Sequence, residues 1–555
     1  MEMLDITLGE LLGQRAREYP NHEAIVYPFE GVRWTYADFK SRVDKIALGM
    51  IRMGVKKGDH VSIWATNVPE WILTQFATAR IGAVLVTVNT NYKTFELEYL
   101  LKQSDTSTLI MTGGFKDSNY IKIINDLCPQ IKESEPGKLN SDKFPYLKNI
   151  VFIGEERYDG MFIFDDLYNM GEDLDAQILD KIENELLAQD VINMQYTSGT
   201  TGFPKGVMLT HYNIVNNGNA IADCMHLSYE DRLCIPVPLF HCFGCVLGVM
   251  AAVTKGATMV FLEYYNPIKV MEAVQREKCT ALHGVPTMFI GILENEKFNE
   301  YDYSTLRTGI MAGSPCPIKV MEQVIDRMNM TDITIAYGQT EFSPVITQTR
   351  VDDPIELRVT TVGKPLPGVE VKIVDPDTGK EVSPGVQGEL IARGYGVMKG
   401  YYKMNEATRA AIDEEGWLYT GDLATMDKNQ YCKITGRLGD MIIRGGENIY
   451  PREIEEFLYT HPAIKDVQVV GVPDEKYGEE IMAYIILRDG LDTYPTEKDI
   501  IDFVKNGLSR FKTPRYVSFI DSYPMTASGK IQKYKLRTMA IDDLGLHDIA
   551  RIETA

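Results

Sequence analysis

The chain has 555 residues and a formal net charge of −21, with 45% hydrophobic and 24% charged residues. This length exceeds what one hydrophobic core supports, so we expect two or more domains, and the acidic balance argues against a broad nucleic-acid-binding surface. Eight cysteines in a chain of this size do not form a disulfide framework, and the apolar run Val246–Val253 is too short to span a bilayer.

The first part of the chain, to about residue 360, alternates strand-like with helix-like segments. Apolar residues at helical spacing predict helices over Tyr36–Met53 and Pro267–Lys278. Short apolar runs predict strands at His60–Ala65, Val84–Asn89, Ile150–Ile153, Arg232–Pro236, Ala257–Leu262 and Thr280–His283. This alternation predicts a layered α/β architecture with largely parallel sheets.

Later segments change character. Strand-like runs at Val369–Val374 and Glu389–Arg393, with a hairpin around Lys428-Asn429, predict a β-rich subdomain. The last part of the chain then forms a separate, small α+β pattern. It has strands at Val467–Val472, Ile481–Leu487 and Tyr516–Ile520 and a helix near Lys498–Leu508.

A loop rich in glycine and hydroxyl groups spans residues 197–206, Thr-Ser-Gly-Thr-Thr-Gly-Phe-Pro-Lys-Gly, after the strand-like run Val191–Tyr196. Glycines let backbone N–H groups turn toward an anion, hydroxyls donate hydrogen bonds, and Lys205 supplies a mobile positive charge. The loop is not a Walker A motif, because Pro204 stands where that motif needs glycine. Alone, these residues fit a phosphate-binding loop and a flexible surface turn equally well.

Four further motifs follow in order. Residues 337–341 read Tyr-Gly-Gln-Thr-Glu and residues 419–422 read Tyr-Thr-Gly-Asp. Residues 436–450 read Gly-Arg-Leu-Gly-Asp-Met-Ile-Ile-Arg-Gly-Gly-Glu-Asn-Ile-Tyr, and residues 524–530 read Pro-Met-Thr-Ala-Ser-Gly-Lys. With the loop, this ordered set resembles the adenylate-forming superfamily of acyl-CoA synthetases, peptide-synthetase adenylation domains and luciferases, from Thr7 to about Thr538. Through Pro238–Gly244, Ala312–Pro315 and Arg444–Pro451, the chain most resembles the medium-chain fatty acyl-CoA synthetases.

The resemblance implies a large N-terminal AMP-binding domain, residues 1–437, built of layered α/β sheets plus a β-rich subdomain. A small, mobile α+β domain, residues 438–555, follows it. The implied reaction joins a carboxylate to ATP, giving acyl-AMP and pyrophosphate, and then passes the acyl group to the cosubstrate CoA, releasing AMP. Both first reactants are anions, so the site, which also binds Mg²⁺, must neutralise charge and hold the attack in line.

The resemblance also assigns the nucleotide site. Glu341 matches the magnesium ligand, Asp422 is expected at the ribose hydroxyls, and Lys530 is expected to bridge the substrate carboxylate and the α-phosphate. The residues expected to be catalytic are Lys530, Lys205, Thr340, Glu341 and His241. The full set expected around ATP or AMP is Thr197, Ser198, Gly199, Thr200, Thr201, Gly202, Lys205, Gly313, Ser314, Pro315, Ala336, Tyr337, Gly338, Gln339, Thr340, Asp422, Ile434, Arg437 and Lys530.

A third group of expected residues concerns the acyl chain and CoA. The acyl pocket is expected at Phe240, His241, Gly244, Gly248 and Ala312, where small residues leave volume for an aliphatic chain. Gly445 and Gly446 are expected to line the pantetheine tunnel, and Arg510 and Lys512 to meet CoA phosphates. Gly439 is the expected hinge. Many acyl-CoA synthetases carry Asp or Lys at that position. Glycine allows the backbone of the hinge to rotate, but it has no side chain that could favour one of the two domain arrangements.

Plainer interpretations exist for each residue. A tyrosine such as Tyr337 usually packs, Gly421-Asp422 is a common turn dipeptide, and a lysine such as Lys530 is usually solvated. Cys242 and Cys245 have CxxC spacing but no second ligand pair, which favours packing over metal or redox chemistry. The joint spacing of the motifs favours the functional interpretation for the others.

We therefore expect an ATP-dependent acid–CoA ligase acting on small-molecule substrates, with no nucleic acid partner and no stable membrane insertion. The alternatives are an enzyme that loads a separate carrier protein and a nucleotide-binding regulatory protein without catalysis. The N-terminal residues lack a signal-peptide pattern, so a reducing cytoplasm is expected. The identity of the acid and the oligomeric state, a homodimer included, stay open.

Overall fold

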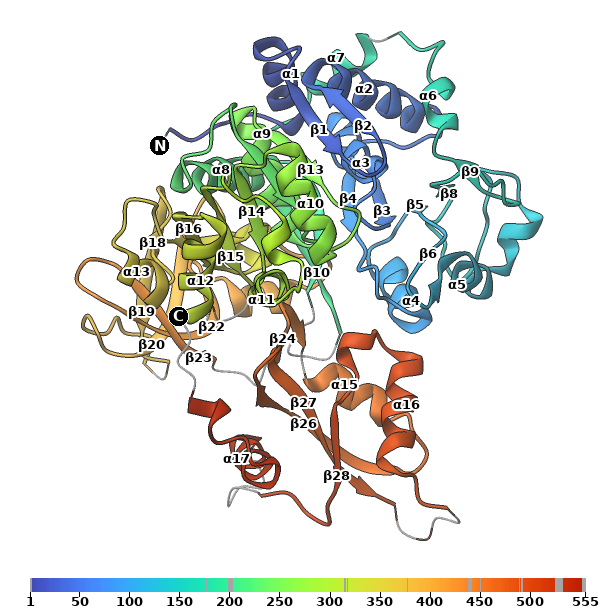
Figure 1. The fold of residues 1–555 in the computed structure, drawn as a ribbon. Helices are drawn as coiled ribbons and strands as arrows, with labels where there is room; N and C mark the ends of the chain where they lie inside the picture. The colour runs from blue at the N-terminus through green and yellow to red at the C-terminus, as the bar shows by residue number, and fades with distance from the viewer. Residues whose placement is uncertain are drawn as a thin grey trace.

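The computed structural model describes residues 2–175, 177–197, 203–313, 316, 318–376, 378–437, 442–449, 451–488, 490, 493–524 and 533–551. These residues form two large sheets, a four-stranded sheet and a C-terminal unit with a sheet of its own (Figure 1). The expected fold class, layered α/β sheets followed by a small α+β domain, is confirmed.

The first large sheet has nine strands, parallel in its middle and antiparallel toward both edges. Its order is β18 (Lys364–Pro365), β17 (Val345–Gln348), β16 (Asp332–Gly338), β15 (Thr308–Ala312), β14 (Ala281–Gly284), β12 (Arg232–Ile235), β13 (Thr258–Phe261), β1 (Glu23–Tyr27) and β2 (Val32–Thr35). Its central strands are buried apolar runs, as expected for a parallel sheet covered on both faces.

The second large sheet has eight strands and is parallel from β10 to β9. Its order is β21 (Gly400–Tyr401), β11 (Lys205–Thr210), β10 (Val191–Thr197), β4 (Val84–Thr87), β3 (His60–Trp64), β5 (Thr108–Met111), β8 (Asn149–Phe152) and β9 (Phe162–Ile163). Because β10 and β11 form an antiparallel pair, Thr197 lies opposite Lys205 at the two ends of the glycine-rich loop.

Helices cover these sheets, and several of them begin at residues typical of helix N-termini. Thr35 and Asp38 form a capping box before α2, and Asn266 caps α10, which begins with proline. The helices are α1 (Leu8–Glu18), α2 (Tyr36–Arg52), α3 (Pro69–Arg80), α4 (Thr94–Gln103), α5 (Tyr120–Leu127), α6 (Asp166–Met170), α7 (Gln177–Glu183), α8 (His211–Cys224), α9 (Ala251–Lys255), α10 (Pro267–Glu277), α11 (Pro286–Leu293), α12 (Ile318–Met328), α13 (Ile355–Thr360) and α14 (Asn405–Ala411). Short 3₁₀ helices are η1 (Pro129–Glu133), η3 (Phe298–Glu300) and η4 (Thr340–Phe342).

One helix has an unusual geometry. The segment η2 (Phe243–Met250) is a buried π-helix that continues into α9, and it contains most of the longest apolar run. π-Helical turns are rare and often occur at functional sites. Nothing in the apolar pattern of this segment distinguishes it from an ordinary buried helix.

The β-rich subdomain is an antiparallel sheet of β19 (Val369–Val374), β20 (Gly388–Gly394), β22 (Leu418–Met426) and β23 (Cys432–Arg437). The predicted hairpin around Lys428-Asn429 is the turn between β22 and β23. A separate small hairpin, β6 (Gly114–Phe115) with β7 (Ser118–Asn119), lies in the N-terminal part.

The C-terminal unit has its own core. Its strands are β24 (Ile442–Arg444), β25 (Glu447–Ile449), β26 (Ile464–Asp474), β27 (Gly478–Leu487) and β28 (Tyr516–Phe519), and its helices are α15 (Pro451–Leu458), α16 (Glu497–Gly507), η5 (Arg510–Lys512), α17 (Lys533–Leu544) and η6 (Ile549–Arg551). Side chains alternate along β27, so that Ile481 and Ala483 join one buried cluster and Met482 and Tyr484 another on the opposite face. Figure 1 shows β24 at the end of this unit that is nearest the N-terminal body.

Candidate active site

The candidate site lies where strands of both large sheets end. Ala312 and Ala336 are register partners at the carboxyl ends of the parallel strands β15 and β16. Thr197 ends β10 in the other sheet, and its hydroxyl lies 3.4 Å from Glu341 Oε1. In open α/β sheets the carboxyl ends of parallel strands form the usual crevice for ligands.

A lysine, a glutamate and a tyrosine meet at this edge. The Tyr401 hydroxyl donates to Glu341 Oε1 at 2.8 Å, and the Lys205 ammonium lies 4.8 Å from the centre of the Tyr401 ring. Burial lowers the pKa of Lys205, and the Glu341 carboxylate offsets part of that shift. The cluster therefore presents a partly desolvated cation beside a carboxylate whose orientation is fixed by a hydrogen bond.

The expected base and ribose residues are joined directly. The Tyr337 hydroxyl donates to Asp422 Oδ2 at 2.7 Å, and Asp422 is only 2% exposed. Asp422 lies on β22 opposite Arg437 of β23. Ile434, from the same strand, is half-buried, so this β-hairpin forms one wall beside Tyr337.

Other members of the expected nucleotide set lie on the same edge. Gly313 has φ of +89° and is exposed directly after β15. A Cβ on Gly338 would come within 1.9 Å of the Pro344 carbonyl oxygen, and the Gln339 N–H donates to that same oxygen. Only glycine permits this close backbone approach at position 338, which lets the chain turn toward Thr340 and Glu341.

Thr340 and His241 both lie close to the Cys242 sulfur. The Thr340 hydroxyl is 3.8 Å from the Cys242 sulfur, and His241 Nδ1 accepts the Phe243 N–H at 3.1 Å. Burial lowers the pKa of His241, while the nearby Glu447 carboxylate raises it. Because Nδ1 acts as an acceptor, the neutral imidazole carries its proton on Nε2.

The C-terminal unit reaches this site through the turn between β24 and β25. Gly445 and Gly446 have φ of +59° and +87°, and a Cβ on Gly446 would come within 2.9 Å of Val285 Cγ1. Glu447, which follows the turn, is half-buried and has its pKa raised by burial, against the opposing effect of His241. The two-glycine turn therefore packs directly against the N-terminal domain beside His241.

The expected acyl-pocket glycines have close neighbours. A Cβ on Gly244 would meet the Pro238 carbonyl oxygen at 2.3 Å, and a Cβ on Gly248 would lie 3.2 Å from the Ile235 side chain. Along the direction that a side chain would take, neither glycine faces open volume. They instead permit η2 to pack tightly on β12 and the segment after it. Phe240 is half-buried and Ala312 is buried at the end of β15.

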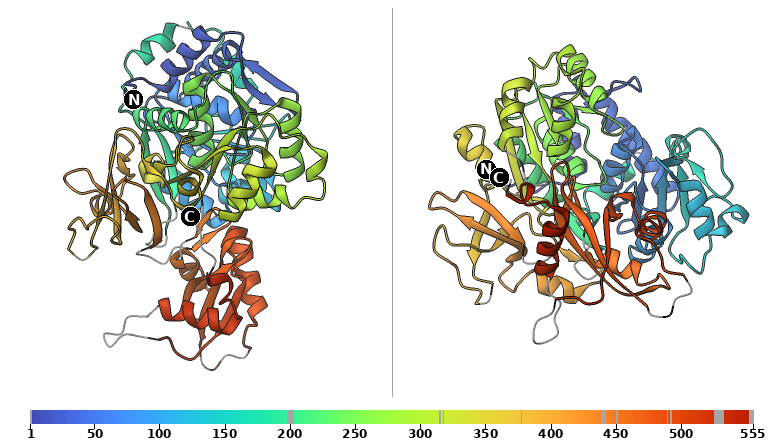
Figure 2. Two further views of the ribbon diagram at one scale, coloured as in Figure 1. Left: turned by 60° about the vertical axis from the view of Figure 1, so that its left-hand side comes forward. Right: turned by 60° about the horizontal axis from the view of Figure 1, so that its bottom comes forward.

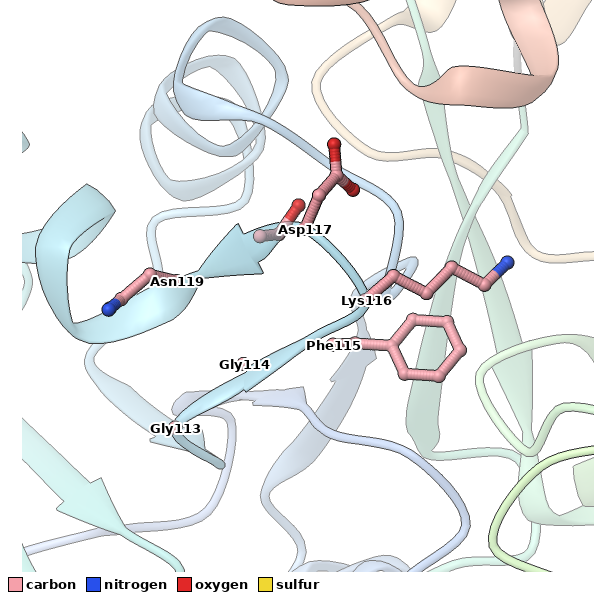
Figure 3. Close-up of a pocket in the computed structure, with 7 residues that line it drawn as sticks. Gly113, Gly114, Phe115, Lys116, Asp117 and Asn119 are labelled. Carbon is pink, nitrogen blue, oxygen red and sulfur yellow. The ribbon is translucent and has the colours of Figure 1, made fainter.

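A pocket of about 310 Å³ opens at the β6–β7 hairpin and is lined by residues 113–119 (Figure 3). Lys116 extends past the Phe115 ring and acts electrostatically on Glu447. Arg510, which is exposed, helps to lower the pKa of Asp117, for which the hydrogen bond from Lys93 is the larger cause. Lys512, expected at the CoA phosphates, is instead buried between two carboxylates.

Several expected residues lie outside the described part of the chain. These are Ser198, Gly199, Thr200, Thr201, Gly202, Ser314, Pro315, Gly439 and Lys530, and for Arg437 only the backbone is described. Sequence reasoning missed three residues of the site, Tyr401, Glu447 and Val285. Glu447 directly follows Gly445-Gly446 in a recognised motif, which was a usable signal. Tyr401 and Val285 lie in no such pattern.

These features define a class of enzymes. The sequence matches the AMP-binding enzyme family over residues 12–402 and the C-terminal domain of AMP-binding enzymes over residues 453–530. The first match alone covers more than half of the chain. The protein therefore belongs to the AMP-binding enzyme family.

Individual relatives place it beside the acyl-CoA synthetases, as the motifs predicted. It is 58% identical to the Bacillus subtilis protein named "Putative acyl-CoA synthetase YngI", over 98% of this chain and 99% of that protein. It is 42% identical to human mitochondrial medium-chain acyl-CoA ligase ACSF2, over 96% of this chain and 87% of the relative. Among solved structures, Bacillus subtilis o-succinylbenzoate CoA synthetase MenE, bound with its product analogue, aligns with a TM-score of 0.78 and 26% identity, covering 95% and 97% of the two chains.

Within the described ranges, no helix combines the length and the apolar character needed to cross a membrane.

Proposed function

We propose that this protein is an ATP-dependent acid–CoA ligase that activates a medium-chain fatty acid. The acid attacks the α-phosphorus of ATP to give acyl-AMP and pyrophosphate, and the CoA thiol then displaces AMP. The observation that carries the proposal is the presence of two groups of residues at the edge where the strands of the large sheets end. Lys205, Glu341 and Asp422 come from the N-terminal domain, and the Gly445-Gly446 turn comes from the C-terminal unit.

For the first step, Lys205 and the loop after Thr197 are proposed to hold the β- and γ-phosphates, since a desolvated ammonium attracts anions strongly. Thr340 is proposed at the α-phosphate. Asp422 offers a carboxylate to the ribose hydroxyls, and Tyr337, tied to it by a hydrogen bond, is proposed to stack on adenine.

Glu341 is the proposed Mg²⁺ ligand. Its carboxylate is held by Tyr401, and a hard cation accepts such an oxygen ligand. Since no group of three or more His, Cys, Asp or Glu gathers to hold a metal among the described residues, phosphate oxygens and water would complete the shell. When bound, the ion neutralises phosphate charge.

Lys530 is the proposed catalytic lysine of the first step and Gly439 the proposed hinge between residues 1–437 and 438–555. The chain leaves the β-rich sheet at Arg437 and enters the C-terminal sheet at Ile442, which supports a boundary there. Lys530→Ala is expected to lose about 3 kcal/mol of transition-state stabilisation in adenylation, the scale of a lost oxyanion donor. Thioester formation from supplied acyl-AMP should persist.

For the second step, the turn at Gly445-Gly446 is proposed to border the pantetheine path. A turn of two glycines carries no side chain that would obstruct a thin substrate beside it. The path would lead from His241 past Glu447 toward the hairpin pocket. There the exposed Lys116 and Arg510 are proposed to attract the CoA phosphates.

The medium-chain acid is supported by the name of the ACSF2 relatives. A cytoplasmic location is proposed because all eight cysteines are buried and free, which fits a reducing compartment.

The test is acid-dependent pyrophosphate release by purified enzyme, with and without CoA, across linear acids from short to long and several aryl acids. Acyl-CoA is identified by mass spectrometry. We expect a maximum at medium length and thioester formation only with CoA. Asp422→Asn should reduce both products, whereas an exposed control such as Tyr494→Ser should not. Pyrophosphate release without any thioester in the presence of CoA would contradict the ligase and favour a carrier-protein acceptor. No release with any acid would favour a regulatory protein.

A further inference from the structure

A buried ion cluster joins the two domains, and none of its residues belongs to a recognised motif. The Lys512 ammonium lies 2.8 Å from Glu96 Oε1 and 2.6 Å from Glu453 Oε1. Their side chains are 3%, 2% and 8% exposed, respectively. Glu96 belongs to α4 of the N-terminal domain, and Glu453 and Lys512 belong to the C-terminal unit. The lysine therefore bridges the domain boundary away from solvent.

Further contacts complete the cluster on the N-terminal side. The Ser509 hydroxyl lies 2.8 Å and 2.9 Å from the two Glu96 carboxylate oxygens, and Glu96 Oε2 also accepts the Lys93 N–H. The Tyr92 ring centre lies 5.3 Å from the Lys512 ammonium. Both oxygens of Glu96 are thus satisfied, partly by its own helix and partly by the other domain.

Two carboxylates share one ammonium, and helix geometry offsets the excess charge. Glu96 lies in the first turn of α4 and Glu453 in the first turn of α15, where the positive ends of helix dipoles favour anions. Burial lowers the pKa of Lys512, but Glu453 and Glu96 outweigh it and raise the pKa above its ordinary value. The lysine therefore stays charged, and removing one partner from such a group leaves uncompensated buried charge.

The same domain arrangement brings the two-glycine turn to the site. With Lys512 bound to Glu96, Gly446 packs on Val285 and Glu447 lies beside His241. Phe95 and Phe457, whose ring centres are 6.4 Å apart, add an apolar contact between α4 and α15. Figure 2 shows the C-terminal unit from two further sides in this arrangement. A rotation of the C-terminal unit relative to the N-terminal domain would carry Ser509 and Lys512 away from Glu96.

We propose that Lys512 is a positioning residue for thioester formation. Together with Glu96 and Glu453 it holds the C-terminal domain in the arrangement that places the Gly445–Glu447 turn at the site. This inference rests on the proposed two-step ligase reaction. It assigns Lys512 to one domain arrangement and therefore to one half-reaction, without contact to any substrate.

A partly buried ion pair inside the C-terminal unit provides the control. The Lys533 ammonium lies 2.7 Å from Glu455 Oε1, and the Glu455 side chain is 4% exposed. Both residues move with the same domain. We expect that loss of that pair lowers the stability of the unit without changing which domain arrangement is preferred.

The experiment compares Lys512→Met, Glu96→Gln and Lys533→Met in the full chain. Adenylation is followed by pyrophosphate exchange and thioester formation by reaction of supplied acyl-AMP with CoA. We expect Lys512→Met to slow thioester formation by about tenfold or more, the consequence of one broken buried pair, with adenylation within about twofold. Glu96→Gln keeps the shape of the side chain. It should slow thioester formation less than Lys512→Met does, again with little change in adenylation. Lys533→Met should change the rates of the two half-reactions to the same extent.

A second readout does not depend on CoA chemistry. Dyes at the exposed positions Tyr146 and Tyr494, one in each domain, report the domain arrangement by energy transfer. Lys512→Met should change the transfer efficiency of the unliganded protein, whereas Lys533→Met should leave it unchanged. Equal losses in both half-reactions, or an unchanged transfer efficiency, would overturn the proposal. If wild-type protein forms no thioester with any acid, the ligase function fails, and energy transfer alone then decides the role of Lys512.

Discussion

The Tyr401 hydroxyl donates a 2.8 Å hydrogen bond to the Glu341 carboxylate. Tyr401 comes from β21 at the edge of the second sheet, whereas Glu341 comes from η4 after a strand of the first sheet. The bond therefore ties the two large sheets together at the proposed metal ligand. The Met398 N–H donates to the Glu341 carbonyl oxygen and holds the backbone of the same residue.

Tyr401→Phe should slow adenylation by about tenfold, because a hydrogen bond to a charged group contributes about 1.5–3 kcal/mol. The loss should appear as a raised requirement for Mg²⁺, while thioester formation from supplied acyl-AMP changes little. The measurement is pyrophosphate exchange against Mg²⁺ concentration.

Tyr402→Phe is the matched control for this change. The Tyr402 hydroxyl donates to Asp105, away from the site, so its loss should leave the Mg²⁺ requirement unchanged. Equal behaviour of the two variants would remove Tyr401 from the metal site.

Gly446→Val should suppress thioester formation while sparing adenylation. At φ of +87° a branched side chain is strained, and its Cβ would come within 2.9 Å of Val285 Cγ1. Both effects oppose the docking of the turn that we propose to border the pantetheine path. The two half-reactions are measured separately, as for Lys512.

A second substitution separates collision from backbone strain. Val285→Ala in the Gly446→Val background removes the colliding methyl group and should restore part of the thioester rate. No recovery would mean that strain at Gly446 accounts for the whole loss. A parallel loss of adenylation in Gly446→Val itself would show that the turn acts in both steps.

Gly248→Leu should destabilise the protein and not shift its chain-length preference. A side chain at Gly248 enters the contact with Ile235 of β12, and overpacking of such a core costs about 1–3 kcal/mol. Thermal unfolding and the acid panel together check this. Ile235→Ala in the same background should recover stability. A clear shift toward shorter acids at unchanged stability would return Gly248 to the acyl pocket.

Local patterns predicted much of the fold. Strands such as β12 and β13 were recognised to within about two residues, because buried parallel strands are continuous apolar runs between turns. The turn between β22 and β23 was likewise predicted at Lys428-Asn429, and the helix α10 was predicted from the helical spacing of its apolar residues. Each of these patterns involves only residues that are close together in the sequence, so no knowledge of tertiary contacts is needed to recognise it.

Contacts between distant segments could not be predicted in this way. Lys512 and Glu96 are separated by 416 positions, and only the packing of η5 against α4 brings them together. The lysine was expected at CoA for its charge, yet its burial between two carboxylates depends on tertiary structure. Likewise, the sequence could not show that a Cβ on Gly244 would meet the carbonyl oxygen of Pro238 at 2.3 Å.

Acid should destabilise the protein through His211, the first residue of α8. This imidazole is fully buried, its Nδ1 accepts the Leu8 N–H at 3.1 Å, and burial lowers its pKa from 6.5 to about 3. The unfolded chain therefore binds a proton between about pH 6.5 and pH 3 that the folded chain excludes. The resulting stability is fully present above about pH 6.5 and is lost as the pH falls, by up to about 1.4 kcal/mol per pH unit.

His211→Asn keeps an acceptor near Leu8 but removes the titrating group. The variant should be less stable near neutral pH and should lose less stability than the wild type between about pH 6.5 and pH 4.5. Burial also lowers the pKa of His283, to about 4, so His283 likewise destabilises the folded protein as the pH falls. The pH dependence of stability should therefore become smaller in the variant but not disappear. His226→Asn is the control, because His226 is exposed and its φ of +51° suits asparagine. Denaturant unfolding at several pH values measures the slopes, and identical slopes in wild type and His211→Asn would show that His211 does not stay neutral in the folded protein.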